Sequence, residues 1–402
     1  MTDARRAAEL AARESYGRLV AILASRSGDI AGAEDALGEA FASALVAWPE
    51  RGVPENPTGW LLTAARRNVG HVVRHRAVRD DKQADLVLLA EEHGDAASTS
   101  LDKRLELMFA CAHPAIDERV RTPLVLQTIL GLDAEQIASA FLVSPTTMGQ
   151  RLVRSKAKIK NAGIPFEVPA KHELAERLED VLDAIYVAFG TAWDDFDAGR
   201  GLADEAIFLG RCLVTLLPDE PEAKGLLALM LYIDARRDAR RDAAGRFVPL
   251  HAQDPARWNR SQIVLAETLL RSAADRAAGH GRARFQCEAA IQSVHVQRAV
   301  TGVVQHHALR VLYDLLHAMA PSIGVAVGRA AAALEAHDLA SAARFLDELP
   351  ESSIRDYQPY WVARARLAEL GDDRASMNEY LRRALGLTHD PAVRRFLEAQ
   401  LG

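Results

Sequence analysis

The stretch "LDAEQIASAFLVSPTTMGQRLVRSKAKIK" (132–160) predicts two helices separated by a tight turn. In the first helix Ile137 and Phe141 fall on one face and are expected to point inward. Ser144 followed by Pro145 marks the start of the second helix, because a serine side chain caps the first turn and proline fits the first helical position. The combination is typical of a helix-turn-helix motif.

The second of these helices has one apolar and one basic face. Met148, Leu152 and Ile159 recur at helical spacing and are expected to pack inward. The adjacent polar and basic face suits a helix that enters the major groove of DNA, with early residues at base edges and later cations on phosphates. A solvated helix end, whose cations suit the helix dipole, is the alternative. The residues expected to face DNA are Thr146, Thr147, Gln150, Arg151, Arg154 and Lys158.

Composition favours an all-α protein. Hydrophobic residues make up 49% of the chain and charged residues 26%, which is ordinary for a globular protein with a real core. Aromatic residues make up only 6%, and alanine, leucine, arginine and glutamate are abundant, a mixture that favours helices over strands. A chain of 402 residues predicts two or three domains.

Charge and cysteine content limit the class of protein. The net charge of −6 argues against a wholly electrostatic nucleic-acid coat, so any DNA binding must use local basic patches. Cys111, Cys212 and Cys287 are far apart and odd in number, which suits a reducing compartment. No apolar run is long enough to cross a bilayer, and the first residues lack a signal-peptide core. We therefore expect a cytoplasmic protein that has no contact with membranes.

Residues 1–82 are expected to form several helices interrupted by one loop at 48–57, where three prolines and a glycine oppose a continuous helix. The helix before the loop has an acidic side, and the helix that starts at Trp60 becomes basic along its length. Apolar residues before the loop recur at the spacing of one helical face, namely Ala33, Leu37, Phe41 and Leu45.

The rest of the chain divides into three segments. Residues 83–100 have the acidic, small-residue composition of a linker, residues 101–168 form a second helical unit, and residues 172–402 form a large helical region. Within this region 332–349 and 367–385 are similar at an offset of 35, close to the tetratricopeptide (TPR) period. Stacked helix pairs of that kind make a protein-binding scaffold, and an irregular bundle with chance similarity is the alternative. The tract "DARRDARRDAAGRF" is expected to be a solvated helix end and loop.

The order of motifs over residues 10–165 resembles an extracytoplasmic-function (ECF) sigma factor of the sigma-70 family. The segment "AEDALGEAFASALVAW" is similar to the region 2 helix that docks on the clamp of bacterial RNA polymerase, and "WLLTAARRNV" to the helix that lines the melted minus-10 element. The helix-turn-helix is similar to region 4, which reads the minus-35 element. The resemblance implies that the partners are the core polymerase, through its clamp and flap, and promoter DNA.

The resemblance also implies roles for individual residues, each with a plainer alternative. A solvated helix face is the alternative for the acids, an ordinary connector for the loop, and a core position for Trp60. The residues implied to bind core polymerase are Glu34, Asp35, Glu39 and Phe41. Those implied to bind the minus-10 base or its phosphates are Glu55, Asn56, Trp60, Arg66, Arg67, Arg74 and Arg76.

Residues after 170 resemble the helical, TPR-like C-terminal extension of one ECF subgroup. Members often carry Asn-Glu-Gly-Tyr after the segment "ERLEDVLDAIYVAF", whereas this chain has "GTAW" at 190–193. We expect the extension to modulate sigma activity, through contacts within the chain or with a regulatory protein.

No catalytic constellation, cofactor site or metal cage stands out in the sequence, and Cys111 beside Phe109 is expected to be a core residue. We therefore do not expect an enzyme. The competing interpretation is a helix-turn-helix activator or repressor with a partner-sensing helical domain and no sigma activity. That interpretation leaves the proline loop and the basic helix after it unexplained.

Overall fold

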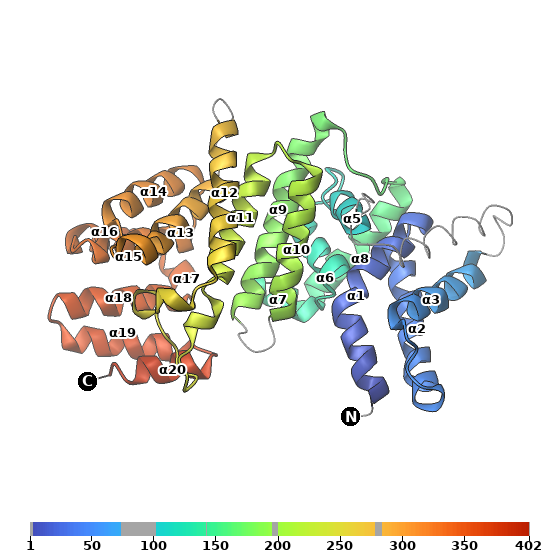
Figure 1. The fold of residues 1–402 in the computed structure, drawn as a ribbon, viewed down its shortest axis with the longest axis horizontal. Coiled ribbons are helices and arrows are strands. Elements are labelled where there is room, and N and C mark those ends of the chain that lie inside the picture. Colours follow the sequence, from blue (N-terminus) through green and yellow to red (C-terminus); the bar gives the residue numbers. More distant parts are fainter. Residues whose placement is uncertain (1–2, 74–101, 142, 195–199, 278–283, 402) are drawn as a thin grey trace. The chain divides into compact units, whose positions relative to one another are not determined.

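The chain is all-α, as its composition predicts (Figure 1). Among the residues that the structure describes there is no strand, and Arg241 and Phe247 form an isolated β-bridge. The chain divides into two compact units, Met1–Cys212 and Leu213–Gly402, which are treated separately below. The finer division into four segments stays a prediction. The computed structural model describes residues 3–73, 102–141, 143–194, 200–277 and 284–401.

The first unit is built around α1. This helix packs against α2, α3, α5 and α6, and it passes close to α6 at Gly17, where a Cβ atom would lie 1.8 Å from the carbonyl oxygen of Ile129. The helices of this unit, in chain order, are α1 (Asp3–Ser27), α2 (Ile30–Arg51), α3 (Pro57–Val73), α5 (Lys103–Cys111), α6 (Glu118–Leu130), α7 (Ala134–Ala140), α8 (Pro145–Ala162), α9 (Lys171–Asp194) and α10 (Arg200–Leu216), the last of which runs past the boundary between the units.

Two features of α2 differ from the sequence prediction. The helix continues through Pro49 to Arg51 and is closed by Gly52, whose N–H donates to the carbonyl of Trp48 in a positive-φ conformation. The connector is therefore shorter than 48–57. The buried face is also rotated from the predicted one, because Leu45 is 49% exposed. The buried residues of α2 are Ile30, Ala33, Ala36, Leu37, Ala40, Ala44 and Trp48.

Helices α9 and α10 belong to the first unit as far as Cys212. Helix α9 packs along α6 and also contacts α5. Arg121 of α6 donates from Nη1 to Oδ2 of Asp180 on α9 at 2.9 Å, and both side chains are mostly buried. Burial raises the pKa of the Asp180 carboxyl against the opposing effect of Arg121. Apolar residues of α9, among them Val181 and Phe189, are fully buried.

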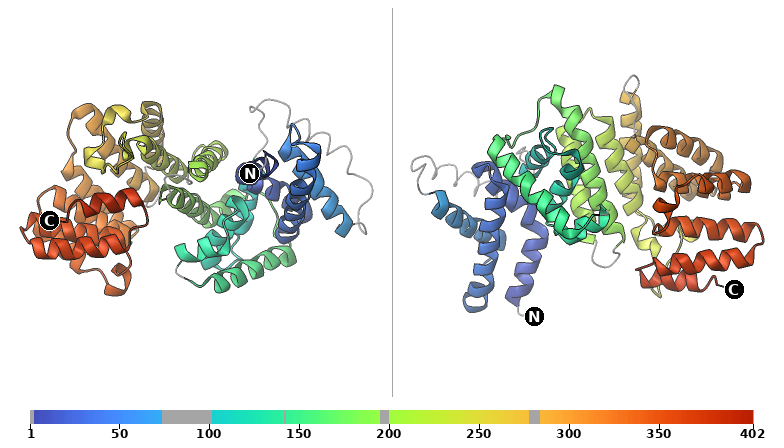
Figure 2. Two further views of the ribbon diagram at one scale, coloured as in Figure 1. Left: turned by 90° about the horizontal axis from the view of Figure 1, so that it is seen from below. Right: turned by 180° about the vertical axis from the view of Figure 1, so that it is seen from behind.

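In its described residues the second unit consists of helices joined by turns and loops, with the β-bridge between Arg241 and Phe247 in one of these connections (Figures 1 and 2). One core joins α15 to α20 around Leu346, Trp361 and Leu381, and another joins α13, α14 and α15 around Ile291 and Leu316. Its helices are α11 (Pro221–Asp234), α12 (Arg260–Ala277), α13 (Arg284–Thr301), α14 (His306–Met319), α15 (Ile323–Glu335), α16 (Leu339–Asp347), α17 (Glu351–Ile354), α18 (Gln358–Leu370), α19 (Arg374–Gly386) and α20 (Pro391–Glu398), with 3-10 turns at Arg237–Arg240, Leu250–Ala252 and Pro255–Arg257.

The internal similarity corresponds to two helix pairs, α15 with α16 and α18 with α19, whose turns repeat at the same offset. His337 and Asp372 both have positive φ, at 58° and 57°. The next residue in each turn caps the following helix: Asp338 accepts from the N–H of Ser341, and Asp373 accepts from the N–H of Ser376. Figure 1 shows the two pairs in orange and red. The name TPR-like remains a prediction.

The tract "DARRDARRDAAGRF" (234–247), at the end of α11, is partly buried. This corrects the sequence prediction of a solvated helix end and loop. Arg236 and Arg237 are 7% and 5% exposed. Arg236 donates to the carbonyl of Tyr232 and to Oε1 of Gln292, so its charge lies inside the unit with hydrogen-bond acceptors. Burial lowers the pKa of Arg236 to about 10.

Candidate nucleic-acid interface

Helix α8 begins where its sequence predicts. Ser144 has extended backbone angles, and its Oγ accepts from the N–H of Thr147 at 3.1 Å. Pro145 occupies the first turn, and Gly163 ends the helix in the left-handed conformation at φ 61°. Helix α7 begins with a capping box in which Asp133 and Gln136 exchange side-chain and backbone hydrogen bonds. The starts of α7 and α8 are therefore both set by residues close to them in sequence.

The apolar face of α8 is buried and the predicted DNA-facing residues lie on the open side. Met148, Leu152 and Ile159 are each 1% exposed. Arg151 is half-buried, and it borders an open pocket of about 390 Å³ together with Arg119 of α6. The remaining predicted DNA-facing residues are all exposed, namely Thr146, Thr147, Gln150, Arg154 and Lys158.

Two other cations of α8 are held by carboxylates at the beginning of α2. Lys156 is 8% exposed at its side chain and donates from Nζ to Oε2 of Glu34 on α2 at 2.5 Å. One turn further on, Lys160 donates from Nζ to Oδ2 of Asp29, the residue that caps α2, at the same distance. The C-terminal half of α8 is thus attached by charge to the beginning of α2. We call this pair of ion pairs the α2–α8 contact.

The two carboxyl groups of the α2–α8 contact differ in environment. Burial raises the pKa of Glu34, and Lys156 opposes that effect only in part. Glu34 Oε1 is buried and has no hydrogen-bond partner. For Asp29, burial would raise the pKa, but the hydrogen bonds from Lys160 and from the N–H of Gly32 outweigh it and the pKa is lowered. Keeping Glu34 ionised therefore costs more free energy than keeping Asp29 ionised.

The structure separates the residues predicted to bind core polymerase. Glu34 is engaged by Lys156, whereas Asp35 and Glu39 are exposed on α2. Phe41 is half-buried. The acidic face of α2 that is open to a partner is thus narrower than the sequence suggests.

The predicted minus-10 residues have mixed surroundings. Glu55 is exposed, and so is Asn56, whose Oδ1 accepts from the N–H of Gly59 at 2.8 Å and caps the start of α3. Trp60 is half-buried and packs edge-on against Trp48, with ring centroids 5.6 Å apart. Arg66 is half-buried and Arg67 is exposed. Arg74 and Arg76 lie outside the described residues.

The role of Lys156 was missed in the sequence, although a signal for it exists. Lys156 follows Leu152 by four residues and precedes Ile159 by three, which places it on the buried face of α8. A lysine on an apolar stripe predicts an acidic partner, because a charge is rarely buried unless it is paired. The sequence does not reveal that this partner is Glu34.

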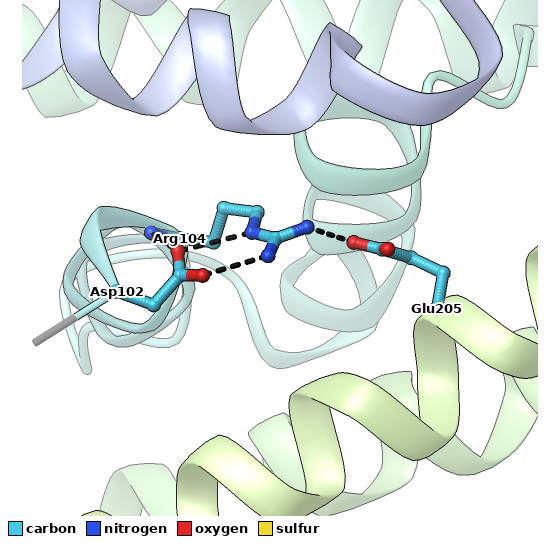
Figure 3. A network of polar contacts seen from close by, with 3 residues as sticks. All are labelled: Asp102, Arg104 and Glu205. Carbon is cyan, nitrogen blue, oxygen red and sulfur yellow. Dashed lines mark hydrogen bonds and ion pairs between the residues drawn. The ribbon is translucent and has the colours of Figure 1, made fainter. Parts of the chain in front are cut away.

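A second charge network, shown in Figure 3, ties α5 to α10. Arg104 donates from Nε to Oδ1 of Asp102 at 3.0 Å and from Nη2 to Oδ2 at 2.7 Å, and its Nη1 reaches Oε1 of Glu205. Its guanidinium also lies 4.9 Å from the ring centroid of Phe208. Burial would raise the pKa of Asp102, but Arg104 outweighs burial and holds it low, whereas burial raises the pKa of Glu205 despite the same cation.

Cys111 and Cys287 are buried, whereas Cys212 is half-buried. Cys111 is fully buried, and burial raises the pKa of its thiol to about 12, so the reactive thiolate is disfavoured. Within the described residues no group of histidine, cysteine, aspartate and glutamate side chains is arranged to hold a metal ion. The same residues contain no helix long and apolar enough to span a bilayer.

Comparison with known proteins adds a partial match to a sigma factor. The chain is 30% identical over 161 residues to the protein named probable ECF RNA polymerase sigma factor SigI of Mycobacterium tuberculosis, in strains CDC 1551 and H37Rv. The match covers 37% of this chain and 53% of SigI. No solved structure matches the chain significantly.

A longer match is to the protein named uncharacterized protein R00370 of Rhizobium meliloti. The two are 33% identical over 356 residues, which covers 84% of this chain and 82% of R00370. Residues 177–274, from α9 into α12, also match a family of unknown function, DUF6596. Because the similarity to R00370 extends over most of both chains, this protein belongs to the same family as R00370.

Proposed function

We propose that this protein is a sigma factor that directs bacterial RNA polymerase to specific promoters. The observation that carries the proposal is the open face of α8, where exposed Thr147, Gln150 and Arg154 lie opposite a fully buried apolar stripe. Polar residues early in such a helix can bond base edges, and the cations that follow can bind phosphates. The partial similarity to SigI supports the same assignment.

In this proposal α2 and α3 serve the polymerase and the minus-10 element. Asp35 and Glu39 supply exposed negative charge on α2 for the polymerase clamp, while Arg67 is an exposed cation on α3. Glu55 and Asn56 lie exposed before α3, although Asn56 also has a structural role as the cap of that helix. We further propose that the second unit acts as a regulatory, protein-binding domain and that the protein has no catalytic role.

In vitro transcription with bacterial core polymerase and promoter fragments tests the proposal. Full-length protein should support initiation, and the double variant Arg151→Ala, Arg154→Ala should weaken it. The matched control is Arg5→Ala, Arg6→Ala, which removes two exposed cations from α1 and should initiate normally. Each lost phosphate contact should also lower the slope of log K against log salt by about one.

The alternative of a regulator without sigma activity makes a different prediction. Such a protein would bind a specific duplex tightly in the absence of polymerase, and the Arg151→Ala, Arg154→Ala variant would lose that binding. If the full-length chain binds duplex alone and never supports initiation, the sigma assignment is wrong.

A further inference from the structure

Val153 is an apolar side chain on the open side of α8. It is 67% exposed, although Leu152 and Ile159 of the same helix are each 1% exposed. Its neighbours one turn away on the same side are Gly149 and Ala157, which are too small to cover it. Val153 is not among the residues predicted to face DNA, which are all polar or charged.

The position of Val153 gives its exposure a meaning that a lone surface valine lacks. Single exposed apolar residues are common on protein surfaces. Val153, however, comes three residues after Gln150 and directly before Arg154, which are both exposed and which the proposed function assigns to DNA. Three residues advance a helix by about 4.5 Å, and successive base pairs are about 3.4 Å apart. A helix that places Gln150 at a base edge therefore brings Val153 close to the next base pair.

The major groove offers a valine one kind of favourable contact. All four bases present hydrogen-bond donors or acceptors there, and thymine alone adds a 5-methyl group. Val153 packed against a polar edge would remove that edge from water without giving it a partner, which costs free energy. Packed against thymine, Val153 instead buries the 5-methyl group and gains from the hydrophobic effect.

We propose that Val153 reads one thymine of the minus-35 element by packing against its 5-methyl group. The inference rests on the proposed sigma function, which places α8 in the major groove. Gln150 then bonds a polar base edge, Arg154 binds phosphate whatever the sequence, and Val153 disfavours a base pair that lacks the methyl group. Loss of the Val153 side chain should relax specificity at one position and leave the salt dependence of binding unchanged.

The structure makes Val153→Ala a suitable probe. Most of the side chain is in solvent, so its truncation opens no cavity in the core of the first unit. Alanine also has a higher helix propensity than valine, so α8 should be at least as stable in the variant. The matched control is Val264→Ala, because Val264 is 65% exposed on α12 of the second unit, to which the proposed function gives no contact with DNA.

Deoxyuridine in place of thymine tests the proposal, because uracil lacks only the 5-methyl group and keeps the same hydrogen-bonding atoms. In a promoter fragment that supports initiation, each thymine of the minus-35 element is replaced in turn on either strand. The dissociation constant of each fragment is measured with core polymerase that carries the full-length protein. At one position wild type should bind the uracil fragment about fourfold more weakly, as expected for one buried methyl group. Val153→Ala should bind the two fragments equally, and Val264→Ala should discriminate like wild type.

The outcomes separate this inference from the sigma proposal. Wild type that binds every uracil fragment as tightly as the thymine fragment would overturn the inference and leave the sigma function intact. So would a Val153→Ala protein that still discriminates, because another residue would then read the methyl group or Val153 would contact a protein partner. If wild type with core polymerase initiates at no promoter, the sigma proposal is wrong and the inference is lost with it.

Discussion

At Gly17 the backbone of α1 passes close to that of α6, and a side chain there has no room. The Cβ atom of alanine would lie 1.8 Å from the carbonyl oxygen of Ile129, so one backbone must move. We expect Gly17→Ala to lower the free energy of unfolding by at least about 2 kcal/mol, measured by urea denaturation. Gly38→Ala, at an exposed site on α2 with nothing within 4 Å, should instead raise it by about 0.5–1 kcal/mol. Equal stability of the two variants would contradict the close α1–α6 contact.

His295 makes the second unit sensitive to acid. Burial, together with the neighbouring charges of Arg236 and Arg298 and with His306, lowers its pKa to about 4. The unfolded chain binds this proton near pH 6.5, so between pH 6.5 and 4 the unfolded state holds more protons and stability falls as pH falls. The linked loss is about 3 kcal/mol over that range.

The variant His295→Gln should therefore lose less free energy of unfolding than wild type as the pH falls from 7 to 4. This free energy is measured at each pH by urea unfolding, monitored by tryptophan fluorescence. His307→Gln, at the exposed residue next to His306, is the matched control and should decline like wild type. A His295→Gln protein with the wild-type decline would show that His295 is not held neutral.

At the level of elements, the ion pairs of Arg104 with Asp102 and Glu205 should be the main polar contact between α5 and α10. The change Arg104→Met leaves two carboxylates, Asp102 and Glu205, without their shared cation in a mostly buried place. We expect it to cost about 3–5 kcal/mol in thermal or urea unfolding. Lys103→Met removes the neighbouring cation, which pairs with Glu106 and is 43% exposed, and should cost at most about 1 kcal/mol. Similar losses in both variants would contradict a buried network.

Local signals in the sequence identified elements well where neighbouring residues decide the structure. The serine cap and proline of α8, its apolar stripe and the repeated turns at an offset of 35 residues all depend on residues close in sequence, and all are present. The prediction for the end of α2 was wrong because Pro49 was treated as a helix breaker, although the helix continues to Gly52. Partners distant in sequence, such as Glu34 for Lys156, depend on packing that no local pattern encodes.

For the candidate nucleic-acid interface, too, the sequence predicted what local periodicity decides and missed what packing decides. The exposed face of α8 follows from periodicity, because a 3.6-residue repeat separates the buried from the solvated side. The engagement of Glu34 and the capping role of Asn56 do not follow from it, because each depends on how α2, α3 and α8 are arranged. The resemblance to sigma factors supplied roles for residues but no information on which of them are occupied within this chain.

For the whole molecule, the boundary of the first unit changes how the chain should be dissected. The sequence suggests a cut near Pro169, before the C-terminal region. In the structure α9 and α10 complete the first unit, since Asp180 pairs with Arg121 and Glu205 with Arg104. A cut at Pro169 would expose the surface of α6 that α9 covers.

We therefore expect a fragment of residues 1–216 to keep a cooperative thermal transition and resistance to limited proteolysis, and a fragment of residues 1–169 to lose both. Each aliphatic side chain exposed by the loss of α9 and α10 should cost about 1.5–3 kcal/mol, so few such residues are needed to unfold a unit of this size. Circular dichroism and protease digestion of the two fragments make the comparison. A 1–169 fragment as stable as 1–216 would show that α9 and α10 are dispensable to the unit. If only the 1–216 fragment is stable, it is also the fragment with which to test whether the second unit activates or restrains transcription. A 1–169 fragment that fails to support transcription would show only that it is unfolded.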